Sequence, residues 1–310
     1  MPRPGGEVET GFTPEAAERC AGPTGPIGSD DLGPVWPGPA LPNPVPPPHQ
    51  AFFRWLTYLV LIPLFLLATA AFGSIALIAS LFDGSGRVQH LIAKTWGGVL
   101  LWIAFSRVRL VGEENFQRSQ AAVYVSNHLS YMDTPVVLSK LPFQFRILAR
   151  HDLFTTPFIG WYLQRSGQIP VDSTSLRSTL ASLNRGVKAL QAGMPLVIFP
   201  EGGRAPDGCL QDFLSGPAYM AIRAHVPIVP MALIGTYELM PMHTYHLTPR
   251  PLLLVVGAPI STAGYTSKTA DALTRRVRDQ ISEMYLRHAG ATSSHIGDRA
   301  ADHRCQRHSD

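Results

Sequence analysis

The sequence predicts an α/β fold with a single mixed sheet of about seven strands flanked by helices, preceded by an N-terminal membrane-associated helix or helical hairpin. Two observations carry this prediction. Beyond residue 106, short β-branched runs alternate with segments of helical periodicity, which is the pattern of α/β layer architectures. Before it, the 28 consecutive residues from Trp55 to Phe82 carry no charge, and such a run is long enough to cross a bilayer.

The strands of the sheet are expected where β-branched and aliphatic residues cluster between turn residues. A helix is expected between them because Leu176, Leu180, Leu183, Val187 and Leu190 recur at steps of four and three and form one buried stripe. A last helix is expected over residues 268–288. The expected strands are residues 107–110, 122–126, 145–149, 168–171, 195–199, 227–234 and 251–256.

Composition divides the chain into four segments. Residues 1–50 hold 13 Pro and 8 Gly with few large apolar side chains, so we expect a disordered tail there. Residues 51–105 form the membrane-associated helical segment, residues 106–290 form the globular domain, and residues 291–310 form a second disordered tail.

Charge and cysteine content limit the classes of function. The tail over residues 1–50 has a net charge of −4, which leaves +8 on the rest of the chain and favours anionic partners such as phosphorylated ligands, anionic lipid or nucleic acid. Nucleic acid is disfavoured because the sequence has no recognisable binding motif and no interleaving of basic and aromatic residues. The three cysteines are far apart and suggest neither a disulfide framework nor a metal site.

The apolar segment has two possible arrangements. Pro63 and the Gly73-Ser74 pair can kink or break a helix, and a second apolar stretch, Trp96–Phe105, is too short to span. A single crossing and a hairpin in one leaflet therefore compete. Basic residues are more frequent downstream of the apolar run than upstream, so the positive-inside rule predicts that the globular domain lies on the cytoplasmic face.

Two short segments could carry chemistry. His128 follows the expected strand at residues 122–126, and Asp133 falls in the first turn of the next helix, where its carboxylate can fix the imidazole tautomer for proton abstraction. A helix-capping His-Asp pair is the competing interpretation. The second segment, Phe199 to Arg204, places Glu201 and Arg204 around Gly202 and Gly203, which suits a phosphate-bearing acceptor. Its competing interpretation is a tight turn with a local Glu-Arg ion pair.

Taken in order, these residues resemble the glycerolipid acyltransferase family, of which the 1-acylglycerol-3-phosphate acyltransferases are the best-known members. The resemblance covers about residues 100–260. His128 and Asp133 match the family's histidine, four residues, aspartate motif. Residues 167–172 (GQIPVD), 199–204 (FPEGGR) and 226–230 (VPIVP) are similar to its second, third and fourth blocks.

The resemblance implies an O-acyltransferase domain over residues 106–290. His128 would deprotonate the acceptor hydroxyl, and Arg150, Glu201 and Arg204 would bind the acceptor head group. Gly202 and Gly203 would supply backbone N–H groups to the developing oxyanion. The implied reaction moves an acyl group from acyl-CoA or acyl carrier protein to a membrane lysophospholipid. The favoured acceptor is 1-acylglycerol-3-phosphate, which would give phosphatidic acid. No cofactor and no metal are implied.

The sequence departs from the family at positions that concern phosphate. Ser173 stands where the second block ends in arginine, Gly203 replaces a threonine, and Leu214-Ser215 lack a lysine. Fewer cations remain, so other acceptors stay open: a lyso-ornithine lipid, another lysophospholipid or glycerol-3-phosphate. A non-catalytic, membrane-anchored binding protein is the alternative from another class.

Overall fold

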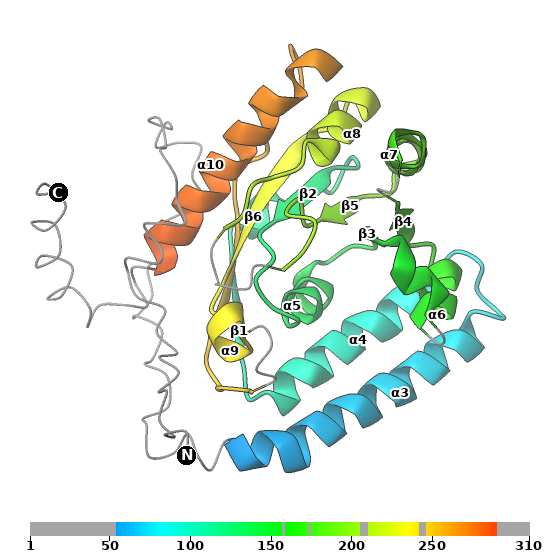
Figure 1. The fold of residues 1–310 in the computed structure, drawn as a ribbon, viewed down its shortest axis with the longest axis vertical. Coiled ribbons are helices and arrows are strands. Elements are labelled where there is room, and N and C mark those ends of the chain that lie inside the picture. The colour runs from blue at the N-terminus through cyan, green and yellow to red at the C-terminus, as the bar shows by residue number, and fades with distance from the viewer. Residues whose placement is uncertain (1–53, 157–158, 173–174, 205–209, 242–245, 290–310) are drawn as a thin grey trace, which may run out of the picture.

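The computed structural model describes residues 54–156, 159–172, 175–204, 210–241 and 246–289 (Figure 1). The tails expected at residues 1–50 and 291–310 lie outside these described residues, as do all three cysteines.

Within the described residues, seven strands form one sheet, as predicted. Each strand begins one residue after the start of its predicted run. The strands are β1 (Val108–Val111), β2 (Val123–Ser126), β3 (Arg146–Arg150), β4 (Ile169–Val171), β5 (Leu196–Ile198), β6 (Ile228–Ile234) and β7 (Leu252–Val256).

The sheet is mixed, which confirms the predicted class. Its strand order is β1-β7-β6-β2-β5-β3-β4, and the pairs are parallel except for the antiparallel pair of β6 and β7. In the middle of the sheet, Val125 of β2 lies opposite Ile198 of β5 and Pro230 of β6. The carboxyl ends of β2, β5, β6 and β3 therefore meet at one edge, where open α/β sheets bind ligands.

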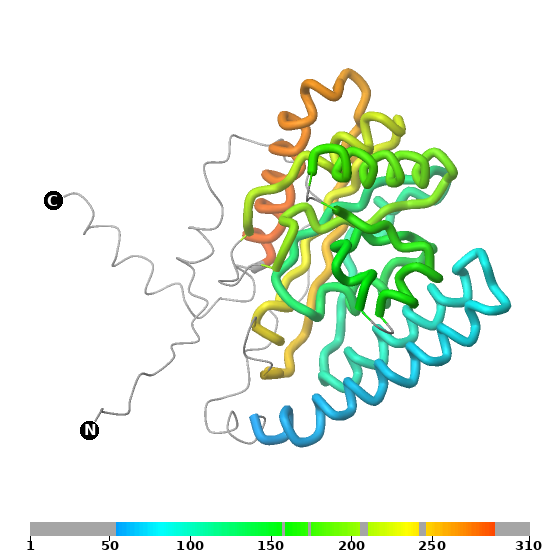
Figure 2. The backbone as a smooth tube through the Cα atoms, turned by 45° about the vertical axis from the view of Figure 1, so that its right-hand side comes forward, coloured from blue at the N-terminus to red at the C-terminus, as the bar shows by residue number. Residues whose placement is uncertain are grey.

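Helices cover both faces of the sheet (Figures 1 and 2). Val123 and Val125 of β2 belong to a core that includes residues of α7, α8 and α10, whereas Tyr124 between them belongs to a second core with residues of α4 and α5. This alternation follows from the two-residue period of a strand. The helices are α3 (Ile62–Ala79), α4 (Arg87–Ile103), α5 (Asp133–Lys140), α6 (Ile159–Arg165), α7 (Leu176–Gln191), α8 (Gly216–Ala224), α9 (Thr236–Leu239) and α10 (Ala270–Ala289).

The stripe predicted for α7 is only partly buried. Val187 and Leu190 are buried, but Leu176 is 77% exposed and Leu180 is 41% exposed, because the first turns of α7 extend beyond the apolar core. Ser175 is the N-cap, and its hydroxyl accepts a hydrogen bond from the backbone of Ser178 in a reciprocal capping box. Residues 173–174, which precede this cap, lie outside the described residues.

The apolar segment forms a helical hairpin. Residues Arg54–Ala79 make one helix that is long and apolar enough to cross a membrane, and most of its surface is exposed. Gly73 does not interrupt it. Pro63, which lacks a backbone N–H, follows a π-helical turn at Thr57–Leu61. A short turn then leads into α4, which packs between α3 and α5 (Figure 1).

Candidate active site

The candidate site is built on the chain that leaves β2. Asn127 follows the strand directly, and its carboxamide accepts from Leu233 N (2.8 Å) and donates to Leu233 O (2.9 Å) on the neighbouring strand β6. This pair of hydrogen bonds continues the contact of β2 with β6 by one residue beyond the ladder. His128 is therefore held at the carboxyl edge of the sheet.

His128 and Asp133 are brought together. The imidazole Nδ1 lies 2.9 Å from Asp133 Oδ2, and the same oxygen accepts the backbone N–H groups of Leu129 (2.7 Å) and Ser130 (2.8 Å). Asp133 is fully buried at the first position of α5, where the helix dipole favours a carboxylate. A carboxylate beside Nδ1 favours the tautomer that carries its proton there, so Nε2 keeps the lone pair that can accept a proton.

Two residues of the FPEGGR segment, which follows β5, contact His128. The ring of Phe199 stacks on the imidazole with 4.2 Å between centroids and 19° between planes. Glu201 Oε1 accepts the backbone N–H of His128 at 2.8 Å, and Oε2 accepts that of Gln211 at 3.3 Å. Burial raises the pKa of the Glu201 carboxyl to about 8, against the opposing effect of these two N–H groups.

Glu201 thus makes contacts that neither sequence-based interpretation named. Its oxygens contact backbone groups, which ties the loop after β5 to the loop after β2. In the described residues it forms no ion pair with Arg204. The acceptor-binding role predicted for Glu201 stays a prediction, and in this geometry the side chain positions His128.

The rest of the segment is an exposed turn. Gly202 has a φ of +71°, a left-handed conformation that glycine adopts at no steric cost, and its N–H faces Phe199 O at 3.4 Å. Gly203 is exposed with open space around it. The guanidinium carbon of Arg204 lies 3.8 Å from the centroid of the Tyr131 ring, in the loop between His128 and Asp133.

Arg150 lies at the same edge, at the end of β3. Since β5 separates β3 from β2, the two strand ends are about 10 Å apart at the usual strand spacing. Its guanidinium makes a bidentate ion pair with Asp152 (3.1 and 2.9 Å), which lowers the pKa of that carboxyl. Both side chains are exposed, so solvent screens the pair and a phosphate ligand can compete for the arginine.

The second and fourth blocks contribute to the sheet. Residues 167–172 supply the edge strand β4, and residues 226–230 lead into β6. Pro230, which cannot donate a ladder hydrogen bond, is tolerated in this inner strand because pairing with β7 begins at Met231. Both blocks therefore shape the sheet that carries the site.

The sequence assigned no role to Asn127, Tyr131 or Phe199, although each lies within or directly beside the two segments that could carry chemistry. These three residues contact residues that are distant in the chain, and spacing in the sequence does not specify how an aromatic ring is oriented. The available signal was Tyr131, an aromatic residue three positions after the candidate general base.

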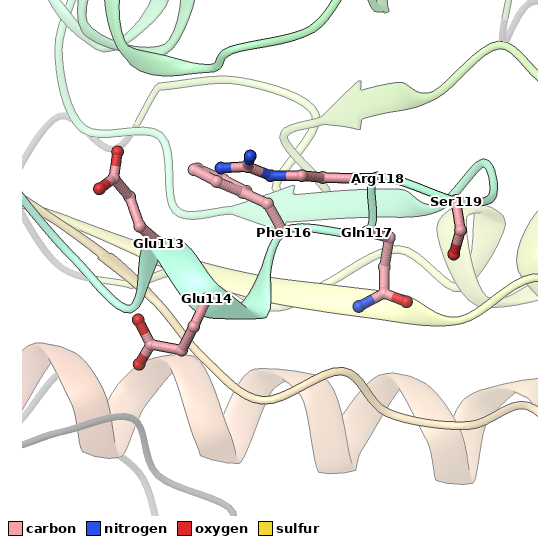
Figure 3. Close-up of a pocket in the computed structure, with 6 residues that line it drawn as sticks. All are labelled: Glu113, Glu114, Phe116, Gln117, Arg118 and Ser119. Atoms are coloured by element: carbon pink, nitrogen blue, oxygen red, sulfur yellow. The ribbon is translucent and has the colours of Figure 1, made fainter.

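A pocket elsewhere does not coincide with this site. Within the described residues, a shallow pocket lies near the beginning of β2, at the edge of the sheet opposite to His128 (Figure 3). The described residues include no group of His, Cys, Asp and Glu arranged to hold a metal ion. The lining residues are Glu113, Glu114, Phe116, Gln117, Arg118 and Ser119.

Comparisons with known proteins identify the family of this chain. A family model described as acyltransferase matches residues 107–234. The chloroplastic 1-acyl-sn-glycerol-3-phosphate acyltransferase of Arabidopsis thaliana is 34% identical over 206 residues, which are 66% of this chain and 56% of that protein. A 1-acyl-sn-glycerol-3-phosphate acyltransferase of Chlamydomonas reinhardtii is 30% identical over 234 residues, which are 74% of this chain and 67% of that protein.

The fold is also known. The crystal structure of the 1-acyl-sn-glycerophosphate acyltransferase PlsC from Thermotoga maritima superposes with a TM-score of 0.61 at 24% identity, covering 76% of this chain and 94% of that one. The chain belongs to the acyltransferase family. Its named relatives in that family are 1-acyl-sn-glycerol-3-phosphate acyltransferases, and the match spans little more than half the length of the Arabidopsis protein.

Proposed function

We propose that this protein transfers an acyl group from an acyl thioester to the free hydroxyl of 1-acylglycerol-3-phosphate and so forms phosphatidic acid. The observation that carries the proposal is the 2.9 Å contact between His128 Nδ1 and the buried Asp133 carboxylate, at the ligand-binding edge of the sheet. The names of the relatives support the acceptor. The donor is acyl-CoA or acyl carrier protein, and no cofactor or metal ion takes part.

In the proposed mechanism, His128 Nε2 takes the proton of the acceptor hydroxyl while that oxygen attacks the thioester carbonyl. The tetrahedral intermediate collapses, the C–S bond breaks, and the imidazolium returns the proton to the departing thiolate. Asp133 stabilises the imidazolium between these steps. Backbone N–H groups at Gly202 and Gly203 are the proposed donors to the oxyanion, and the Gly202 N–H would exchange its 3.4 Å contact with Phe199 O for the oxyanion. No protein nucleophile is required.

Two arginines are the proposed contacts for the acceptor phosphate. Arg204 lies above the loop that carries His128, and Arg150 lies at the end of β3 on the same edge of the sheet. A guanidinium fork matches two phosphate oxygens and keeps its charge at any physiological pH. In this proposal the phosphate lies beside His128 and the hydroxyl faces the imidazole.

An acceptor panel tests the proposal. The purified, membrane-reconstituted protein is incubated with acyl-CoA and, separately, with 1-acylglycerol-3-phosphate, lyso-ornithine lipid, other lysophospholipids, glycerol-3-phosphate and phosphate-free 1-monoacylglycerol. We expect lipid mass spectrometry to find phosphatidic acid as the preferred product, with 1-monoacylglycerol a poor acceptor. Preference for another acceptor would reassign the substrate, and a folded protein inactive with every acceptor would support the non-catalytic binding protein.

We also propose that α3 lies in the plane of one leaflet and does not cross the membrane. The helix packs along α4 and against α6. If α3 crossed the bilayer in this arrangement, Lys94 of α4 would enter the hydrocarbon region, at about 3 kcal/mol for a charge at its centre. Arg87 and Arg165, which lie near the end of α3, would have to pass through the bilayer to its far side. The globular domain then lies on the cytoplasmic face, as the excess of downstream basic residues favours.

Protease protection in inverted membrane vesicles separates the two arrangements. With epitope tags at the two chain termini, the in-plane arrangement predicts that added protease removes both tags, because both termini lie on the outer, formerly cytoplasmic surface. A protected N-terminal tag with a digested C-terminal tag would instead require that α3 spans the bilayer. Detergent-treated vesicles, in which both tags must be digested, are the control.

A further inference from the structure

Arg204 is restrained by an aromatic ring and not by a carboxylate. The residue is exposed and follows Gly203, which has open space around it, so the turn itself offers the side chain little support. In the described part of the chain, no carboxylate lies within ion-pair distance of its guanidinium. The guanidinium contacts the ring of Tyr131, whose centroid lies 3.8 Å from the guanidinium carbon.

The Tyr131 ring is held by the same loop that holds the catalytic pair. On one side, Ser130 donates its N–H to Asp133 Oδ2 and its hydroxyl to Met240 O at 2.9 Å. On the other, Met132 is buried and its N–H donates to the Ser130 hydroxyl at 3.2 Å. The position of the ring therefore depends on the hydrogen bonds that place His128 against Asp133.

A guanidinium over a ring face retains its donors for a ligand. The contact uses the π-face of Arg204, while the N–H groups point outward in the guanidinium plane, where a phosphate is bound in bidentate fashion. An exposed contact of this kind corresponds to about a two- to fivefold change in an equilibrium constant. The effect on an acceptor also includes the arginine freedom that the ring removes before binding.

We propose that Tyr131 is a positioning residue that holds Arg204 for the acceptor phosphate, so that phosphate recognition on the loop after β5 is tied to the proton-accepting His128 on the loop after β2. This inference rests on the proposed function, and it deepens that function by assigning phosphate selectivity to the Tyr131–Arg204 pair. Together with the hydrogen bond from His128 N–H to Glu201 and the stacking of Phe199, it gives the two loops three separate contacts.

The test compares Tyr131→Leu with Tyr131→Phe, which keeps the ring. With the wild type as reference, we expect Tyr131→Leu to raise the KM for 1-acylglycerol-3-phosphate about 3- to 10-fold and to leave the KM for acyl-CoA unchanged. Tyr131→Phe should stay within about twofold of the wild type. Neither variant should change the KM for 1-monoacylglycerol, which has no phosphate. Equal losses in both variants, or equal losses on both acceptors, would overturn the proposal.

A double-mutant cycle tests whether Tyr131 acts through Arg204. Arg204→Ala, at an exposed site, should raise the same KM, and adding Tyr131→Phe or Tyr131→Leu should then have no further effect. Arg223→Ala, at an exposed arginine on α8, is the matched control and should behave as the wild type. Additive losses in the double variant would show that Tyr131 does not act through Arg204.

Equilibrium binding separates this inference from the proposed reaction. Titration of the protein with 1-acylglycerol-3-phosphate in detergent, without any thioester, should give a Kd that is 3- to 10-fold weaker in Tyr131→Leu, by the same order-of-magnitude argument. Wild-type protein that binds this lipid through Tyr131 and Arg204 but does not acylate it would refute the reaction and keep the inference. Acylation of this lipid together with a Kd that is unchanged by Tyr131→Leu would support the reaction and refute the inference.

Discussion

His128→Ala is expected to lower kcat for acyl transfer by about 10²- to 10⁴-fold, the usual contribution of a positioned general base. The substitution removes the one ring nitrogen that can accept the hydroxyl proton. It leaves Asp133 Oδ2 with the N–H groups of Leu129 and Ser130, so the loop keeps two of its three hydrogen bonds to that oxygen. Because the imidazole contacts the reacting hydroxyl and not the phosphate, the Kd for 1-acylglycerol-3-phosphate should change little.

The measurement is phosphatidic acid formed per enzyme under saturating acyl-CoA, with folding followed by circular dichroism. His225→Asn is a suitable control, because His225 is exposed and has a φ of +57°, a left-handed conformation that asparagine tolerates and alanine does not. It removes an imidazole without altering the backbone. Wild-type turnover in folded, membrane-bound His128→Ala would refute the role of His128 as the base.

Local sequence signals were sufficient for the strands and for the contact between His128 and Asp133. Each strand is a short run rich in β-branched and aliphatic residues, and such runs can be located without knowing their neighbours. His128 and Asp133 are five positions apart across one strand-to-helix turn, so their contact depends on local geometry. The antiparallel placement of β7 could not be derived, since it depends on a long connection after β6 and not on any residue within the strand.

The contacts that complete the site are non-local, which is why they were missed. Glu201 reaches the backbone of His128 across 73 positions of sequence. Sequence chemistry alone favoured a ligand for this carboxylate, because a charged residue beside two glycines suggests exposure. Its actual burial follows from the adjacency of β2 and β5. The prediction that the whole apolar stripe of α7 is buried was wrong for a related reason. Periodicity shows which side of a helix is apolar but not how far the core extends along that helix.

Asp133→Asn is the second substitution with a large expected effect. The carboxamide oxygen can still accept the N–H groups of Leu129 and Ser130, so the loop is expected to keep its shape. A neutral amide cannot stabilise the imidazolium, and we expect kcat to fall about 10²- to 10⁴-fold while both KM values remain close to those of the wild type. The amide nitrogen would replace Oδ1, which is buried and has no hydrogen-bond partner among the described residues. An unpaired donor there should cost about 1–3 kcal/mol of stability, measurable as a lower Tm.

The double variant His128→Ala/Asp133→Asn decides whether the aspartate acts through the histidine. If Asp133 only orients the imidazole and stabilises its charged form, it has no catalytic effect once the imidazole is gone. The residual rate of the double variant should then equal that of His128→Ala, although each single substitution is severe, as expected for residues that act as a unit. A residual rate reduced by the product of the two single losses would show that Asp133 stabilises the transition state independently, and the proposed proton transfer would need a different partner.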